Sequence, residues 1–302
     1  MIGDRPKVLV GIDGSDDGIR AARYGIGRAK RLGYAVWFVN AVDDGVVSGG
    51  WGVIYDPTVL KEAGEAAVKQ AEELAIAKGL PAEQIITTVA IGNPTTVLGE
   101  FSKEAEMLIV GRRASTGLER MFVGSTSTSL VSSAKCPLIV ISAASTPEPT
   151  GSFHKITVAM GGSGDTALRW ACKEATTRKA TVDVVHVIPY QSRNVISFLP
   201  ASAAQEKNWT DRVVVGLEAM IEPIRKEYPQ VEIRLRSPRG VLVDELIQGS
   251  SSTDLLVIGV KPRPAVTLGG PVRAVLAHAS CPVALISRAG ETNEKRAAST
   301  QE

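Results

Sequence analysis

Residues 8–15 read VLVGIDGS, and residues 156–163 read ITVAMGGS. Each run places an aliphatic stretch before a turn of small and polar residues, which is typical of a buried parallel strand that leads into a helix. The run MLIVG at 107–111 returns with the same spacing as LLVIG at 255–259. The chain therefore contains two copies of one structural unit.

A third pair of runs marks the end of each copy, since KCPLIVIS at 135–142 returns as SCPVALIS at 280–287. Residues 143–152, AASTPEPTGS, are small, polar and interrupted by Pro and Gly, which is the composition of a linker. A length of 302 residues suits two domains of this size. We expect a domain at residues 1–143, a second at residues 153–288 and a flexible tail at residues 289–302.

Within each copy, short aliphatic runs alternate with longer helical patterns. In the first copy we expect strands at 8–12, 35–39, 85–90, 107–110 and 138–142, and helices at 17–32, 59–77, 95–104 and 127–133. This order predicts an α/β chain of two doubly wound Rossmann-like domains, each with a five-stranded, mostly parallel sheet and four helices. Ligands of such sheets bind beyond the carboxyl ends of the strands.

The overall composition excludes several classes of protein. Lys and Arg number 34 against 32 Asp and Glu, so the net charge of +2 gives no basic field for nucleic acid or anionic membrane. Three cysteines without metal-ligand or redox spacing indicate a reducing compartment. The first apolar run is too short for a signal sequence or a membrane span, so we expect a cytoplasmic protein.

Polar residues follow the first and fourth strands. Asp13 stands where a carboxylate can accept a hydrogen bond from a ribose hydroxyl or an adenine amine, whereas Ser15 is expected to cap the next helix. Gly111 closes the fourth strand, and two arginines, Arg112 and Arg113, follow it. The GSTS run at 124–127 opens a helix whose N–H groups and hydroxyls suit an anion.

Neither a Walker loop nor a Gly-x-Gly-x-x-Gly turn is present in the sequence. The order VGIDGS, then VG with GS opening a helix, then CPLIVI, resembles the universal stress protein family in its tandem form. The resemblance covers both copies and implies ATP as the ligand of the first copy, with Mg²⁺ left open. The residues that it implies for ATP are Gly11, Ile12, Asp13, Ala41, Val110, Gly111, Arg113, Ala114, Gly117, Gly124, Ser125, Thr126 and Ser127.

The two copies depart from the family pattern to different degrees. Ala114 stands where the family has its second glycine, which weakens but does not exclude binding in the first copy. In the second copy Gly161 replaces the acid and Pro262 stands at the second glycine. Pro271 also removes an N–H that an anion site would use. We expect the second copy to have lost its nucleotide.

Three functions remain open at this point. The first is a non-catalytic, ATP-dependent regulator in a stress response, as the resemblance implies. The second is a nucleotide-free scaffold, and the third is a weak ATP hydrolase, for which no base or metal-holding acid beyond Asp13 is evident. The three histidines show no spacing typical of a catalytic triad or a metal site, and Cys136 and Cys281 are expected to be buried and inert.

The sequence also carries expectations about assembly. The last strands of the two copies are short aliphatic edges that can pair with each other, so that the chain forms an internal pseudo-dimer. The resemblance to a family that dimerises through this strand points the same way, and a homodimer of chains would use another surface. The long segments at 43–58 and 189–210 carry Trp51, Tyr55, Phe198 and Trp209 and are expected to form a lid or a docking surface.

Overall fold

The computed structural model describes residues 5–43, 57–112, 125–142, 144–145, 153–160, 164–189, 203–261 and 269–287. Three of the aromatic residues noted above, Trp51, Tyr55 and Phe198, lie outside the described residues, as does the tail at 289–302. None of the described helices is long and apolar enough to cross a bilayer.

The first copy has the predicted alternation of strands and helices. Its elements are β1 (Lys7–Gly11), α1 (Asp16–Leu32), β2 (Ala35–Val42), α3 (Pro57–Ala77), β3 (Ile85–Ile91), α4 (Pro94–Phe101), β4 (Met107–Gly111), α5 (Ser125–Ser133) and β5 (Leu138–Ile141). Short 3-10 helices at Ala82–Gln84 and Ser102–Glu104 precede β3 and β4. Strand β2 continues past its predicted end at Val39, because Asn40, Ala41 and Val42 still pair with β3.

The second copy repeats the same order. Its elements are β6 (Lys155–Ala159), α6 (Gly164–Arg178), β7 (Thr181–Val185), α7 (Ala203–Glu227), β8 (Ile233–Arg236), α8 (Leu242–Ser250), β9 (Leu255–Val260), α9 (Gly270–His278) and β10 (Val283–Ser287). The long segment expected at 189–210 is shorter than predicted, since α7 begins at Ala203. Trp209 is therefore a half-buried helical residue.

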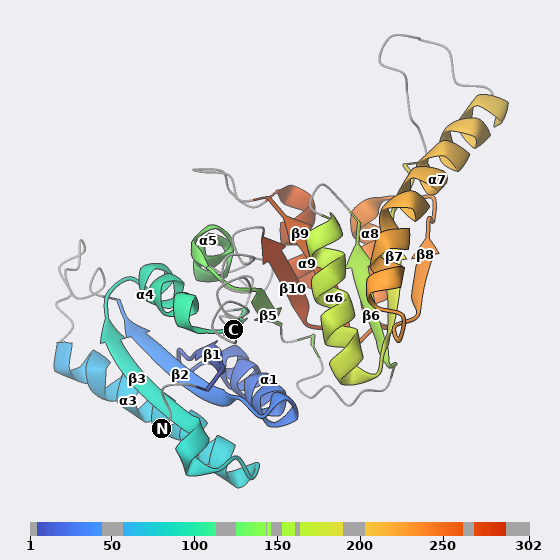
Figure 1. Cartoon of the computed structure of the whole chain (residues 1–302). Coiled ribbons are helices and arrows are strands. Elements are labelled where there is room, and N and C mark those ends of the chain that lie inside the picture. Colours follow the sequence, from blue (N-terminus) through green and yellow to red (C-terminus); the bar gives the residue numbers. More distant parts are fainter. Residues whose placement is uncertain are drawn as a thin grey trace.

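All ten strands form one sheet in the order β3-β2-β1-β4-β5-β10-β9-β6-β7-β8 (Figure 1). Every pair is parallel except the central one, where β5 and β10 run antiparallel with Ile139 opposite Ala284. The expected pairing of the two last strands is confirmed. As a result, the carboxyl ends of the strands of the two copies lie at opposite edges of the sheet.

Helices cover both faces of this sheet. Helices α1, α3, α6 and α7 pack on one face, over a core that includes Val10, Phe38 and Val158. Helices α4, α5, α8 and α9 pack on the other face, over a core that includes Leu108 and Leu256. The chain is thus a three-layer α/β structure, as predicted.

Polar contacts join the copies on both faces of the sheet. Between α1 and α6, Arg28 forms a buried ion pair with Glu174, and Arg178 donates a hydrogen bond to the hydroxyl of Tyr24 at 2.8 Å. On the opposite face, Arg112 donates to the carbonyl oxygen of Ala277 at 2.7 Å. The two copies are therefore held by side chains as well as by the β5–β10 ladder.

Candidate functional site

A cavity of about 420 Å³ lies at the carboxyl ends of β1, β2 and β4, where the fold predicts a ligand. The same cavity is bordered by the first turn of α5 and by α3 and α4. Its walls are formed by Gly11, Ile12, Asp13, Val39, Asn40, Ala41, Val42, Asp43, Leu60, Ala63, Gly64, Pro94, Leu98, Val110, Gly111 and Ser127. Seven of the thirteen predicted site residues are in this list: Gly11, Ile12, Asp13, Ala41, Val110, Gly111 and Ser127.

Asp13 follows β1 and lines this cavity, and its side chain is exposed. One carboxylate oxygen, Oδ1, accepts hydrogen bonds from the Ser15 backbone N–H at 3.0 Å and from the Ser15 hydroxyl at 2.6 Å. Between them Gly14 adopts a φ of 76°, a left-handed conformation that favours glycine. The turn therefore fixes Asp13 through Oδ1, and Oδ2 has no hydrogen-bond partner among the described residues.

Ser15 has the capping role that the sequence indicates. Its hydroxyl oxygen accepts a hydrogen bond from the Gly18 backbone N–H at 3.1 Å, at the first turn of α1. The same serine thus orients Asp13 and begins the helix behind it. The DGS sequence at 13–15 accounts for both the position of the acid and the direction of α1.

Gly111 has a packing role that the sequence did not reveal. A Cβ atom at this position would lie 2.5 Å from the Asp17 carbonyl carbon and oxygen and 2.8 Å from the Gly18 nitrogen. The glycine is therefore required for the close approach of β4 to the first turn of α1. Its predicted role, approach of the backbone to a ligand, stays a prediction.

Ser127 connects α5 to the end of β4. Its side chain is buried, and its hydroxyl lies 3.5 Å from the Gly111 carbonyl oxygen. Ser125 and Thr126 form the start of α5. Because Ser127 lies in the same turn and lines the cavity, the first turn of this helix borders the cavity. Arg113, Ala114, Gly117 and Gly124 lie outside the described residues.

Asn40 is a site residue that sequence reasoning missed. It is buried in β2, and its amide donates a hydrogen bond to the Ile12 carbonyl oxygen at 2.8 Å. A Cβ atom at Gly64 would lie 2.5 Å from the Asn40 amide oxygen, so α3 approaches this side chain closely. The signal in the sequence is an amide within an otherwise aliphatic strand, where a buried polar group needs partners.

Arg112, the first of the two arginines after β4, is not among the residues that line the cavity. Its side chain is buried and reaches the Ala277 carbonyl oxygen of the second copy. It also lies near Asp17, whose pKa is raised by burial and lowered in part by Arg20 and Arg112. Arg112 therefore belongs to the boundary between the copies.

In the second copy a thioether, the side chain of Met160, lies against the start of α6, as the Asp13 carboxylate lies against the start of α1 in the first copy. Gly18 and Gly164 occupy equivalent positions. Gly18 lies eleven residues before Ala29 and Gly164 lies eleven residues before Ala175, and each of these alanines accepts a backbone hydrogen bond at the end of its helix. A Cβ atom at Gly18 would lie 2.6 Å from Asp13 Oδ1, whereas a Cβ atom at Gly164 would collide with the sulfur of Met160. The Met160 side chain thus lies against Gly164 as Asp13 Oδ1 lies against Gly18, whereas Gly161, the residue predicted to replace the acid, lies outside the described residues.

The cysteines are buried, as expected for Cys136 and Cys281. The thiols of Cys136, Cys172 and Cys281 are buried, and burial raises the pKa of Cys281 to about 12. Within the part of the chain that the structure describes, no group of three or more His, Cys, Asp and Glu side chains is placed to hold a metal ion.

Comparison with known proteins gives consistent results for both halves of the chain. The model of the universal stress protein family matches residues 5–142 and residues 152–287. A universal stress protein of Mycobacterium tuberculosis is 27% identical over 295 residues, which cover 91% of this chain and 95% of that protein. A universal stress protein of Methanocaldococcus jannaschii is 31% identical over 142 residues, 45% of this chain and 81% of that protein.

A solved structure shows the same fold. The crystal structure of a universal stress protein from Archaeoglobus fulgidus matches with a TM-score of 0.69 at 16% sequence identity, over 93% of this chain and 96% of that one. The match covers both copies, so the tandem arrangement of two such domains occurs in that protein also.

Proposed function

The chain belongs to the universal stress protein family, in its tandem form, and we propose that its first copy binds ATP and acts as a nucleotide-dependent regulator in a stress response. The observation that carries this proposal is the cavity that joins Asp13, at the end of β1, to the first turn of α5. A carboxylate and a helix N-terminus that border the same cavity, together with aliphatic side chains, suit a nucleotide.

The apolar walls suit the base. Ile12, Val39, Ala41, Leu98 and Val110 surround the space next to Asp13. A purine ring packed against these side chains would lose contact with water without displacing a buried polar group, since Asn40 is already bonded to Ile12. The free Oδ2 of Asp13 would accept a hydrogen bond from a ribose hydroxyl or the adenine amine.

The other end of the cavity suits phosphate. The first turn of α5 presents backbone N–H groups that have no carbonyl partner within the helix, and the positive end of the helix dipole. The hydroxyl of Ser127 lies in this turn and lines the cavity. The family resemblance adds Arg113, Gly124, Ser125 and Thr126 to the phosphate end, with Mg²⁺ left to experiment.

We propose binding without turnover. Asp13 and Asp43 are the acids among the residues that line the cavity, and Asp13 Oδ1 is already engaged by Ser15, so one oxygen of that carboxylate is occupied in holding the turn. A hydrolase would need a base that positions water near the terminal phosphate. Steady-state phosphate release at saturating ATP measures hydrolysis directly. Turnover above the rate without protein would make ATP hydrolysis, rather than regulation, the function of the chain.

The central experiment is calorimetric titration of nucleotide-free protein with ATP. Binding of one ATP per chain is expected, because Gly161 stands at the acid position of the second copy. Asp13→Ala should weaken binding by about 10-fold to 100-fold, the range for a lost hydrogen bond to a charged group. Absence of binding by the wild-type protein would leave the scaffold as the function.

A matched pair of variants separates a blocked cavity from a damaged fold. Ala63 and Ala66 are both exposed residues of α3, but Ala63 lines the cavity and Ala66 does not. Ala63→Trp should abolish ATP binding by filling the space, whereas Ala66→Trp should bind ATP as the wild type does. Equal affinity in both variants would place the nucleotide elsewhere.

A further inference from the structure

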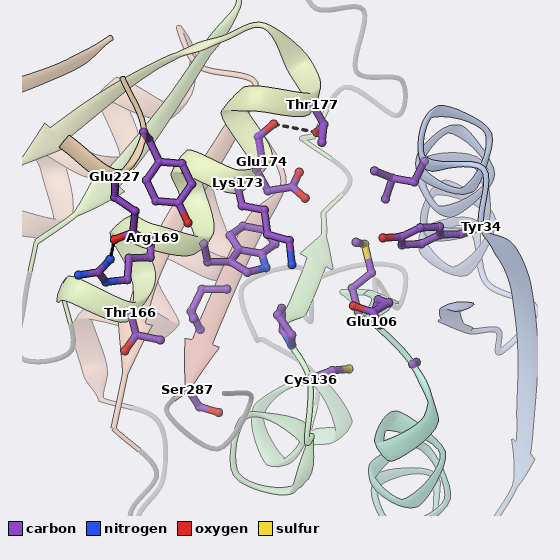
Figure 2. A pocket seen from close by; sticks show the side chains of 17 residues that line it. Tyr34, Glu106, Cys136, Thr166, Arg169, Lys173, Glu174, Thr177, Glu227 and Ser287 are labelled. Atoms are coloured by element: carbon purple, nitrogen blue, oxygen red, sulfur yellow. Dashed lines mark hydrogen bonds and ion pairs between the residues drawn. The ribbon is translucent and has the colours of Figure 1, made fainter. Parts of the chain in front are cut away.

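A second cavity, of about 450 Å³, lies between the two copies (Figure 2). The first copy contributes the end of α1, the start of β2 and the amino ends of β4 and β5, and the second copy contributes α6, the end of α7 and the end of β10. This inter-copy cavity shares no residue with the cavity around Asp13. It therefore has to be explained separately from the proposed ATP site.

The inter-copy cavity exists because the two copies have diverged. Ala29 and Ala175 are equivalent, since each accepts the backbone hydrogen bond of a residue five positions later, just before the next strand. Counting back along α1 and α6 makes Arg28 equivalent to Glu174. The pair Arg28–Glu174 therefore marks the approximate two-fold axis that relates the copies.

The two sides of this axis are filled differently. On one side Arg178 reaches across to the hydroxyl of Tyr24 and closes the space between the helices. By the same count the equivalents of Tyr24 and Arg178 are Trp170 and Leu32. Both of these residues line the inter-copy cavity. The contact between Arg178 and Tyr24 thus fills one side of the axis. On the other side the equivalent residues, Leu32 and Trp170, border the open cavity.

The walls combine aromatic surface with opposite charges from the two copies. Trp170 and Tyr34 are half-buried and offer ring faces, an indole N–H and a hydroxyl. Lys173 brings a positive charge from α6, and Glu106 brings a negative charge from the segment before β4. Figure 2 shows the polar ends of Tyr34, Lys173 and Glu106 pointing into the same space.

Three further charged wall residues, Arg169, Glu174 and Glu227, form ion pairs. Glu174 pairs with Arg28 and Arg178, and Arg169 pairs with Glu227. Burial and the nearby Glu106 raise the pKa of Tyr34, which Lys173 lowers in part. The Tyr34 hydroxyl therefore stays a neutral donor at physiological pH, close to both of the opposite charges.

We propose that the inter-copy cavity binds a free α-amino acid with an aromatic side chain. Its ring would pack against Trp170 and Tyr34, its carboxylate would meet Lys173 and the Tyr34 hydroxyl, and its ammonium group would meet Glu106. Aromatic pairs of this kind add to the burial of apolar area, and charge-assisted hydrogen bonds fix the orientation.

Other ligand classes match these walls less well. A polyphosphate would meet the carboxylates of Glu106 and Glu174, and a hydrocarbon would bring no charge to meet Lys173 and Glu106. A zwitterion satisfies both signs at once. Because the ligand would touch both copies, its binding would also stabilise the intact chain against unfolding.

Calorimetry and thermal melting with L-phenylalanine test the proposal. Saturable binding and a rise in melting temperature are expected. Phenylpropionate lacks the ammonium group, phenethylamine lacks the carboxylate and L-alanine lacks the ring, so each should bind at least about tenfold more weakly. No saturable binding of L-phenylalanine, or equal affinity for all four compounds, would overturn the proposal.

Two variants and their controls assign the charges. Lys173→Met should abolish the preference for L-phenylalanine over phenethylamine, and Glu106→Gln should abolish its preference over phenylpropionate. Lys226→Met and Glu83→Gln change the same residue types at exposed positions outside the cavity and should leave both preferences intact. Binding that is insensitive to Lys173→Met and Glu106→Gln would refute the assignment. ATP titration of the same variants should be unchanged, which separates this proposal from the nucleotide site.

Discussion

Arg28 and Glu174 occupy equivalent positions in the two copies, yet they carry opposite charges and form a buried ion pair of 2.5 Å across the boundary between the copies. Two first copies paired in the same way would bring Arg28 against Arg28, and two second copies would bring Glu174 against Glu174. The divergence at this position thus favours the pairing of unlike copies.

This relationship predicts a rescue experiment. Glu174→Arg would place a third guanidinium group beside Arg28 and Arg178 and should lower the free energy of unfolding by about 3–5 kcal/mol. Adding Arg28→Glu should recover part of this loss in urea denaturation. Additive effects of the two substitutions would show that the pair is not coupled.

The central strand pair gives a second prediction. Ile139 lies in β5, between β4 and β10, and is fully buried. Ile139→Pro removes a backbone donor from a strand that is paired on both sides, so a loss of about 3 kcal/mol or more is expected, with aggregation. Unchanged melting temperature and monodispersity would contradict the pairing of β5 with β10.

Asp17 gives a pH dependence with a defined sign. Its side chain is buried, Oδ1 accepts a hydrogen bond from Arg20 at 2.7 Å, and Oδ2 has no partner among the described residues. Since burial raises its pKa in the folded state, the protonated form is favoured by folding. Stability from this group is complete below its unfolded pKa of about 3.9 and is lost as the pH rises through the folded pKa.

The measurement is a series of urea denaturations at increasing pH. The wild type should lose stability relative to Asp17→Asn between about pH 4 and neutrality, because asparagine does not ionise. A stability difference that is constant with pH would show that the pKa of Asp17 is the same in the folded and unfolded states. Asp16→Asn, at an exposed neighbouring position, serves as the control.

The contact of Gly111 with α1 predicts a contrast between two glycines. Gly111→Ala would force a Cβ atom against the backbone of Asp17 and Gly18, so a loss of about 1–3 kcal/mol is expected, with weaker ATP binding. A Cβ atom at Gly27, inside α1, would meet no atom within 4 Å. Gly27→Ala should therefore stabilise the protein by about 0.5–1 kcal/mol in the same denaturation assay. The reverse order would mean that β4 and α1 can move apart at little cost.

The alternation of strands and helices along the chain and the position of Asp13 at the end of β1 could be predicted because their signals are local. An aliphatic run followed by DGS specifies a strand, a turn and a capped helix within a few residues, and the repeat doubles the evidence. The pairing of the last strands also followed, since two unpaired edges in one chain are a liability that pairing removes.

The features that could not be predicted depend on contacts between distant segments. Asn40 and Gly64 have meaning only when β2 and α3 are adjacent, and the contact of Arg112 with Ala277, 165 residues away, could not be read from the sequence around β4. Ala41 was placed after β2 because the strand was expected to end at Val39, whereas pairing with β3 extends it. The inter-copy cavity arises from differences between equivalent positions of the two copies. The repeated motifs show what the copies share, so they did not indicate these differences.

Strand β4 has one more consequence, which concerns the coupling between two binding events. Met107, at its start, lines the inter-copy cavity, and Val110 and Gly111, at its end, line the cavity around Asp13. At about 3.3 Å per residue the two sites lie on the order of 10 Å apart along one strand. That strand is hydrogen-bonded to β1 and β5 on its two sides. A ligand bound at one end of β4 is therefore expected to cause little movement at the opposite end of the strand. If both proposals hold, the two ligands should shift the melting temperature additively, and by reciprocity neither should alter the dissociation constant of the other.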